Sequence, residues 1–141
     1  MFEIYDIDEM EAEALLSKDE SHFLDFKSKL ASGTNLQRLL SAFANTDGGE
    51  IYLGVEDKKT TPYTSLLDLW NGYTDQEEAN AHVQNEAVHI NPTLPDCTYE
   101  FFSIKGRPEK GLILRILVEK SPHVHYTSDK KVGNYKTKAT Y

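Results

Sequence analysis

The chain has 141 residues, enough for one domain with a hydrophobic core and too few for two domains of ordinary size. It is 39% hydrophobic and 27% charged, and no apolar run approaches the roughly 20 residues that a membrane-spanning helix needs. The single cysteine, Cys97, excludes an internal disulfide and a CxxC zinc site. Because the acidic N-terminus does not resemble a secretory signal either, we expect a cytoplasmic protein with no membrane partner.

The charge is distributed unevenly along the chain. Fifteen Lys and Arg against 23 Asp and Glu give a net charge of −8, which argues against a nonspecific, charge-driven nucleic-acid binder. Residues 1–100 carry 6 basic and 20 acidic groups, whereas residues 101–141 carry 9 and 3. Residues 1–20 alone have a net charge of −7, which leaves −1 for the rest. This distribution is compatible with nucleic-acid binding through a local basic patch.

The first predicted elements are a helix and a short strand. A helix is expected over residues 8–17, with Met10, Ala14 and Leu15 on its inward face behind acidic residues that suit a helix N-terminus. A strand is expected over residues 22–27, where apolar and polar side chains alternate.

The clearest helix comes next. Its apolar stripe has the spacing i, i+3, i+4, i+7 and consists of Leu36, Leu39, Leu40 and Phe43. The helix is expected to end in residues 45–49, because Gly48 and Gly49 permit a left-handed exit. A strand over residues 50–55 should follow.

The second half of the chain predicts a turn of helix over 66–70, a helix over 74–90 and a hairpin of strands 99–104 and 112–118. Residues 112–118 are apolar on both faces, which is typical of a central strand. A last strand is expected over 135–140. The order of elements indicates a single α+β domain, a mixed and mostly antiparallel β-sheet with two to three helices packed on one side.

Two blocks of the chain carry recognisable motifs. The first is Glu20-Ser-His-Phe-Leu-Asp-Phe-Lys27, and the second is Ser41-Ala-Phe-Ala-Asn-Thr-Asp-Gly-Gly49 followed by Ile51-Tyr-Leu-Gly-Val-Glu-Asp57. They resemble the blocks E-S-x-x-x-E-F-K and A-F-A-N-T-x-G-G…h-G-V-x-D of the Schlafen/Alba-like (Schlafen AlbA-type) domain family. Val88-His-Ile-Asn-Pro92 resembles the helix end with I-x-P that follows in the family, and Ser121-Pro122 and Asn134-Tyr-Lys136 are weak matches to its closing segments. The resemblance covers roughly residues 15–140, and its middle block is the most specific.

The resemblance implies a nucleic-acid-associated domain of the family's bacterial branch, the N-terminal part of a longer transcriptional-regulator or helicase-related protein. It divides the chain into an acidic N-terminal helix, residues 1–18, and the Schlafen/Alba-like domain, residues 19–141. In vertebrate relatives a related domain cuts structured RNA with three carboxylates and a divalent metal ion. By position, those carboxylates fall on Glu20, Asp25 and Asp57.

Carboxylates that converge on one point can hold Mg²⁺ or Mn²⁺, the only cofactors expected here and only if the chain is a nuclease. Side chains five positions apart on a strand point to opposite faces, so Glu20 can lie near Asp25 only if it is in the turn before the strand. Asp25 is one methylene shorter than the Glu at this position of the family motif. The alternative is local structure: Glu20 caps a turn, Asp25 pairs with Lys27 or Lys29, and Asp57 closes a turn.

Lysines that can contact phosphate occur in three places. They are Lys27 and Lys29, Lys58 and Lys59, and the tail group Lys130, Lys131, Lys136 and Lys138. Tyrosines between the tail lysines favour a strand of nucleic acid as ligand, because rings can stack on bases. The alternative is a solvated edge strand whose lysines discourage aggregation.

Three functions of different classes follow. The first is a DNA- or RNA-binding regulatory domain. The second is a metal-dependent endoribonuclease that acts on tRNA-like RNA through Glu20, Asp25 and Asp57. The third is a non-catalytic module that forms a homodimer through a sheet edge.

Overall fold

A computed structural model describes the backbone of residues 3–31, 33–87, 90–91, 97–120, 126–132 and 135–140, and the side chains of residues 3–31, 36–83 and 97–120. Its elements are β1 (Ile4–Ile7), α1 (Glu9–Leu16), β2 (Leu24–Lys27), α2 (Gly33–Asn45), β3 (Gly49–Leu53), the 3-10 helix η1 (Leu66–Leu69), α3 (Gln76–Ala87), β4 (Ile90–Asn91), β5 (Cys97–Ile104), the 3-10 helix η2 (Pro108–Lys110), β6 (Ile113–Val118), β7 (Tyr126–Val132) and β8 (Tyr135–Thr140). None of the helices described has both the length and the apolar character to cross a membrane.

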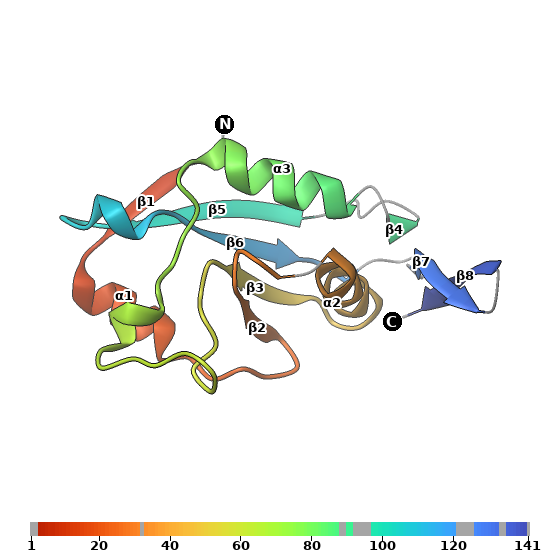
Figure 1. The fold of residues 1–141 in the computed structure, drawn as a ribbon, viewed down its shortest axis with the longest axis horizontal. Helices are drawn as coiled ribbons and strands as arrows, with labels where there is room; N and C mark the ends of the chain where they lie inside the picture. The colour runs from red at the N-terminus through yellow and green to blue at the C-terminus, as the bar shows by residue number, and fades with distance from the viewer. Residues whose placement is uncertain are drawn as a thin grey trace.

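The main sheet has five strands in the order β1-β5-β6-β3-β2, so β6 is central and β1 and β2 are the edges (Figure 1). The edge strands pair in parallel, β1 with β5 and β2 with β3. The inner pairs β3–β6 and β5–β6 are antiparallel. The predicted α+β class, mixed sheet and central position of residues 112–118 are therefore confirmed.

Hydrophobic clusters cover both faces of this sheet. Helices α2 and α3 pack on one face, against Ile51 and Leu114, while α1 and η1 pack on the other, against Tyr52 and Ile113. Figure 1 shows α3 and α1 on opposite sides of the strands. The prediction of helices on one side was wrong, because consecutive residues of β3 and β6 are buried on opposite faces and each face needs a cover.

Helix α1 begins as expected, with a capping box between Asp8 and Glu11. The predicted inward face was right at Leu15 but wrong at Met10, which is 80% exposed, and at Ala14, which is exposed as well. The helix packs through Ala12, Leu15 and Leu16. Strand β1, which was not predicted, joins the N-terminal segment to the main sheet, and α1 packs in the hydrophobic cluster on one face of that sheet.

The last predicted strand is present as β8 but does not join the main sheet. It pairs with β7, and β7 pairs with β4, which gives a separate three-stranded sheet. Figure 1 shows this small sheet at the right-hand end of the molecule, beyond α2. The side chains of Lys130, Lys131, Lys136 and Lys138 lie outside the described residues, and so do the weak motif matches at 121–122 and 134.

Candidate functional site

A pocket of about 630 Å³ lies beside the C-terminal end of the edge strand β2. Three segments of the chain line it: residues 18–20 after α1, residues 26–28 and 30–31 of β2 and the following loop, and residues 55–60 after β3. The two latter segments meet because β2 and β3 are parallel, which brings their carboxyl ends to the same end of the sheet. The two motif blocks thus end at one pocket.

A second hollow, of about 710 Å³, lies between β2 and α2. Its lining includes Phe23, Asp25 and Phe43. It shares Glu20 and Lys27 with the first pocket, so the two hollows flank the edge strand on either side.

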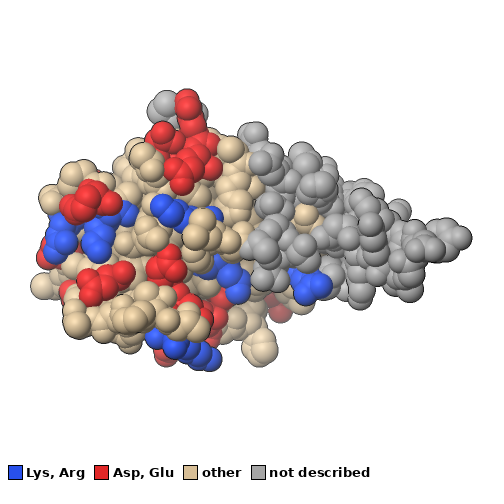
Figure 2. All heavy atoms as spheres, in the orientation of Figure 1, with Lys and Arg blue, Asp and Glu red and all other residues tan. Residues whose placement is uncertain are grey.

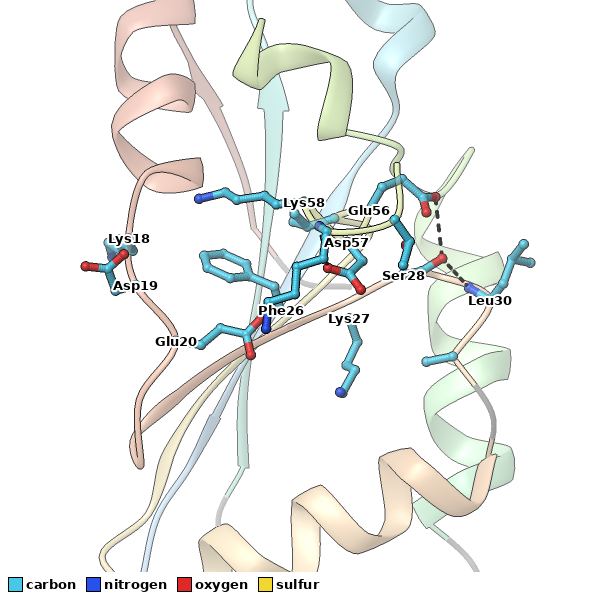
Figure 3. A pocket seen from close by; sticks show the side chains of 14 residues that line it. Lys18, Asp19, Glu20, Phe26, Lys27, Ser28, Leu30, Glu56, Asp57 and Lys58 are labelled. Atoms are coloured by element: carbon cyan, nitrogen blue, oxygen red, sulfur yellow. Dashed lines mark hydrogen bonds between the residues drawn. The ribbon is translucent and has the colours of Figure 1, made fainter. Parts of the chain in front are cut away.

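Glu20 lies in the turn before β2, as its spacing from Asp25 predicts. Burial raises the pKa of the Glu20 carboxyl to about 7, and the hydrogen bond and negative charge of Asp25 contribute next. The charge of Asp57 raises the same pKa further, whereas the Lys27 ammonium lowers it. Figure 3 shows the carboxylates of Glu20 and Asp57 pointing into the same pocket. The Glu20 carboxyl therefore lies within electrostatic reach of both Asp25 and Asp57.

These carboxylates do not fit a three-ligand metal site as they stand. Asp25 forms an ion pair with Lys27 (Oδ2–Nζ 3.3 Å) and accepts a hydrogen bond from its neighbour's backbone N–H. Asp57 closes a turn, since its Oδ1 accepts a hydrogen bond from the Lys59 backbone N–H at 2.9 Å. Among the residues that the structure describes, no group of three or more His, Cys, Asp or Glu is arranged to hold a metal ion.

Three of the predicted lysines, Lys27, Lys58 and Lys59, line the pocket. The structure adds Lys18, whose Nζ donates a hydrogen bond to the Tyr52 hydroxyl at 3.2 Å and lies 5.5 Å from the centre of that ring. Sequence reasoning missed Lys18 because it follows α1 and lies outside the motif blocks.

Lys29, also predicted to contact phosphate, has a structural contact instead. Its Nζ donates a hydrogen bond to the Gly72 carbonyl oxygen at 3.2 Å, which ties the loop after β2 to the segment before α3. It does not line the pocket.

Comparison with known proteins assigns the family. Residues 20–140 match the model of the family described as Schlafen, AlbA_2. The chain belongs to this family. No curated protein matches its sequence.

Two solved structures resemble the Schlafen, AlbA_2 domain described here. One is the N-terminal domain of a RecG-related protein from Nitrosomonas europaea, with 20% identity, a TM-score of 0.56, and coverage of 87% of this chain and 82% of that one. The other is the DIP2311 protein from Corynebacterium diphtheriae, with 18% identity and a TM-score of 0.46. In that case 92% of this chain covers 26% of the other. The first likeness shows that the fold is shared.

An aromatic pair forms one wall of the pocket in this AlbA_2 domain. The rings of Phe26 and Tyr52 stack with centroids 5.4 Å apart and an interplanar angle of 30°. Phe26 lines the pocket, whereas Tyr52 is 2% exposed and belongs to the core beneath. Sequence reasoning missed Phe26 as a site residue, although its alternation with Asp25 and Lys27 placed it on the opposite face of β2 from them.

The loop after β2 forms the facing wall, and hydrogen bonds fix it at both ends. The Ser28 hydroxyl donates to a Glu56 carboxylate oxygen at 3.4 Å. At the other end, the Ala31 carbonyl oxygen lies 3.3 Å from His82 Nε2, and His82 Nδ1 lies 2.8 Å from the Tyr73 hydroxyl. The pocket of the AlbA_2 domain is therefore preformed on both sides.

Proposed function

We propose that this AlbA_2 domain is the nucleic-acid-binding part of a regulatory or helicase-related protein, and that its ligand's phosphates are held at the pocket beside β2. One observation carries the proposal: Lys18, Lys27, Lys58 and Lys59 come from three separate segments and line one pocket. The Nitrosomonas relative, described as related to an ATP-dependent DNA helicase, supports it.

The charges around the pocket set the strength of binding. Its lining has four lysines and four acidic residues, the latter being Asp19, Glu20, Glu56 and Asp57. Figure 2 likewise shows basic and acidic side chains interspersed over the described part of the visible face. Binding of a polyanion therefore depends on local contacts rather than on the field of the whole domain, and it should be moderate and sensitive to salt.

Fluorescence anisotropy with labelled DNA and RNA oligonucleotides tests this function. The double variant K58E/K59E should bind about 10-fold more weakly than the wild type at low salt, and its salt slope should fall by about 1.5. The matched control K105E/K110E makes the same charge change at the β5–β6 turn, away from the pocket, and should bind like the wild type. Equal losses in the two variants, or no binding by the wild type at low salt, would reject the proposal.

A metal-dependent endoribonuclease that acts on tRNA-like RNA is the second candidate. The effect of both Asp25 and Asp57 on the Glu20 carboxyl favours it. It ranks second because Asp25 and Asp57 already have local partners. The test is cleavage of a tRNA transcript with and without Mn²⁺ or Mg²⁺. Cleavage that needs the ion and is lost in Asp57→Asn supports the candidate, and cleavage that persists in this variant rejects it.

A further inference from the structure

We infer that the nucleic acid bound at this pocket is single-stranded and that one unpaired base stacks on Phe26. The inference rests on the proposed function and names the class of ligand for the same site. Three features support it: the Phe26 ring is stacked on the buried Tyr52, it lies in a pocket, and the basic and acidic residues that line this pocket nearly balance in charge.

The Phe26 ring is held in place before any ligand arrives. Behind it lies Tyr52, stacked at 5.4 Å and buried in the core. Tyr52 is itself held by the hydrogen bond from Lys18 to its hydroxyl. The remaining surface of the Phe26 ring lines the pocket. A ring that is already ordered loses little conformational freedom when a base stacks on it, which favours binding.

The surroundings of Phe26 exclude a base that is still paired. Figure 3 shows the ring between the Lys18–Glu20 segment and Lys58, with the loop that carries Ser28 beyond. In a duplex the faces of the bases are covered by their neighbours, and only their edges are accessible in the grooves. A base must leave the stack to present its face to a ring inside a pocket. The volume of about 630 Å³ lies in the range that accommodates a small organic ligand.

The balance of charge in the pocket also favours a single-stranded ligand. Four lysines opposed by four acidic residues attract a phosphate backbone only weakly. Glu56 is engaged by Ser28 and by Asn71, whose Nδ2 donates to its Oε1 at 2.9 Å. Since charge supplies little of the binding, stacking has to supply a substantial share, and base–aromatic stacking is available only to unpaired bases.

The test compares three labelled ligands of one sequence by anisotropy: a 12-nucleotide single-stranded DNA, its RNA counterpart and the blunt DNA duplex. The wild type should bind a single strand at least about 10-fold more tightly than the duplex. Phe26→Leu should weaken single-strand binding about 10-fold and leave duplex binding unchanged, because leucine fills the space against Tyr52 but cannot stack. The control Phe23→Leu alters a ring that is 54% exposed and lines the other hollow, and it should bind like the wild type.

A second variant guards against misfolding of F26L. Phe26→Trp offers a larger stacking surface and should bind the single strand at least as tightly as the wild type.

If F26L binds all three ligands like the wild type while K58E/K59E fails to bind, the inference is wrong and the proposed function stands. Duplex binding as tight as single-strand binding also overturns the inference. If the wild type binds none of the ligands, the proposed function falls and the inference falls with it. The DNA and RNA arms show which kind of strand is bound.

Discussion

The stacked pair of Phe26 and Tyr52 joins the candidate site directly to the core, with Phe26 lining the pocket and Tyr52 buried beneath it. The two residues are register partners on the parallel strands β2 and β3, so the sheet itself sets their contact. Changes to Tyr52 should consequently affect both stability and the shape of the pocket.

The separate roles of the ring and the hydroxyl of Tyr52 can be distinguished by substitution. Tyr52→Phe removes only the hydrogen bond from the exposed Lys18 and should lower the free energy of unfolding by about 1 kcal/mol or less. Tyr52→Leu removes a buried ring and its stacking contact with Phe26, and should lower the free energy of unfolding by about 2–4 kcal/mol. Urea unfolding followed by circular dichroism measures both. Equal losses for the two variants would show that the stack does not stabilise the domain.

Arg115 lies between two glutamates on the face of the sheet that α1 and η1 cover. Its guanidinium forms ion pairs with Glu50 on β3 and Glu100 on β5, and all three side chains are largely buried, with 21–24% exposure. Arg115→Met leaves two carboxylates close together without a cation and should lower the free energy of unfolding by about 2–3 kcal/mol at pH 7. Urea unfolding at pH 7 measures the loss.

The triple variant E50Q/R115M/E100Q is the control for this prediction. Because it removes the charges together, it should regain most of the stability that R115M loses at pH 7. A triple variant as unstable as R115M would assign the loss to packing of the arginine stem rather than to unpaired charge.

The sequence predicts some parts of the candidate site and not others, as the positions of Glu20 and Asp57 show. The motif blocks placed Glu20 before β2 and Asp57 after β3, which are opposite ends of this parallel pair. Both line one pocket because the segment that carries Glu20 turns back against β2, with Ser21 in an antiparallel bridge to Leu24. Lys18 lines the pocket because of the path that the chain takes between α1 and β2, and no local sequence pattern predicts that path. Phe26 was expected to face away from Asp25, but its exposure depends on how far α1 and η1 cover that face.

The two errors in the predicted fold have related physical causes. Met10 was placed inward from helical spacing alone, whereas the orientation of α1 is set by its contact with a second core on the far face of the sheet. Strand β1 was not predicted because it is short and its first three residues are exposed. Local periodicity shows which residues share a face, and only the tertiary arrangement decides which face is buried.

Two glycines with a positive φ should differ in their tolerance of a side chain. Gly48, at the exit of α2, has a φ of +83°, and a Cβ there would lie 2.4 Å from the Val118 carbonyl oxygen. Gly106, in the β5–β6 turn, has a φ of +74° and nothing within 4 Å of such a Cβ. Gly106→Ala should cost about 1 kcal/mol from backbone strain alone, whereas Gly48→Ala should cost at least about 2 kcal/mol more. Thermal unfolding of the two variants measures the difference, and equal shifts in Tm would contradict the clash.

The raised pKa of Glu20 predicts the direction in which the free energy of unfolding changes with pH. In the folded domain this carboxyl has a pKa of about 7, against 4.5 without its surroundings, so folding takes up a proton between these values. The contribution of Glu20 to stability therefore falls as pH rises from about 4.5 to about 7 and stays low above that. Glu20→Gln, which keeps a donor for Asp25, should be more stable than the wild type at pH 8, and the difference should close as the pH approaches 4.5.

Urea unfolding at a series of pH values measures the difference in the free energy of unfolding between E20Q and the wild type. The matched control is Glu13→Gln, on the exposed side of α1, whose difference from the wild type should not change with pH in this way. A stability difference between E20Q and the wild type that is constant from pH 4.5 to 8 would contradict the electrostatic contact of Glu20 with Asp25 and Asp57.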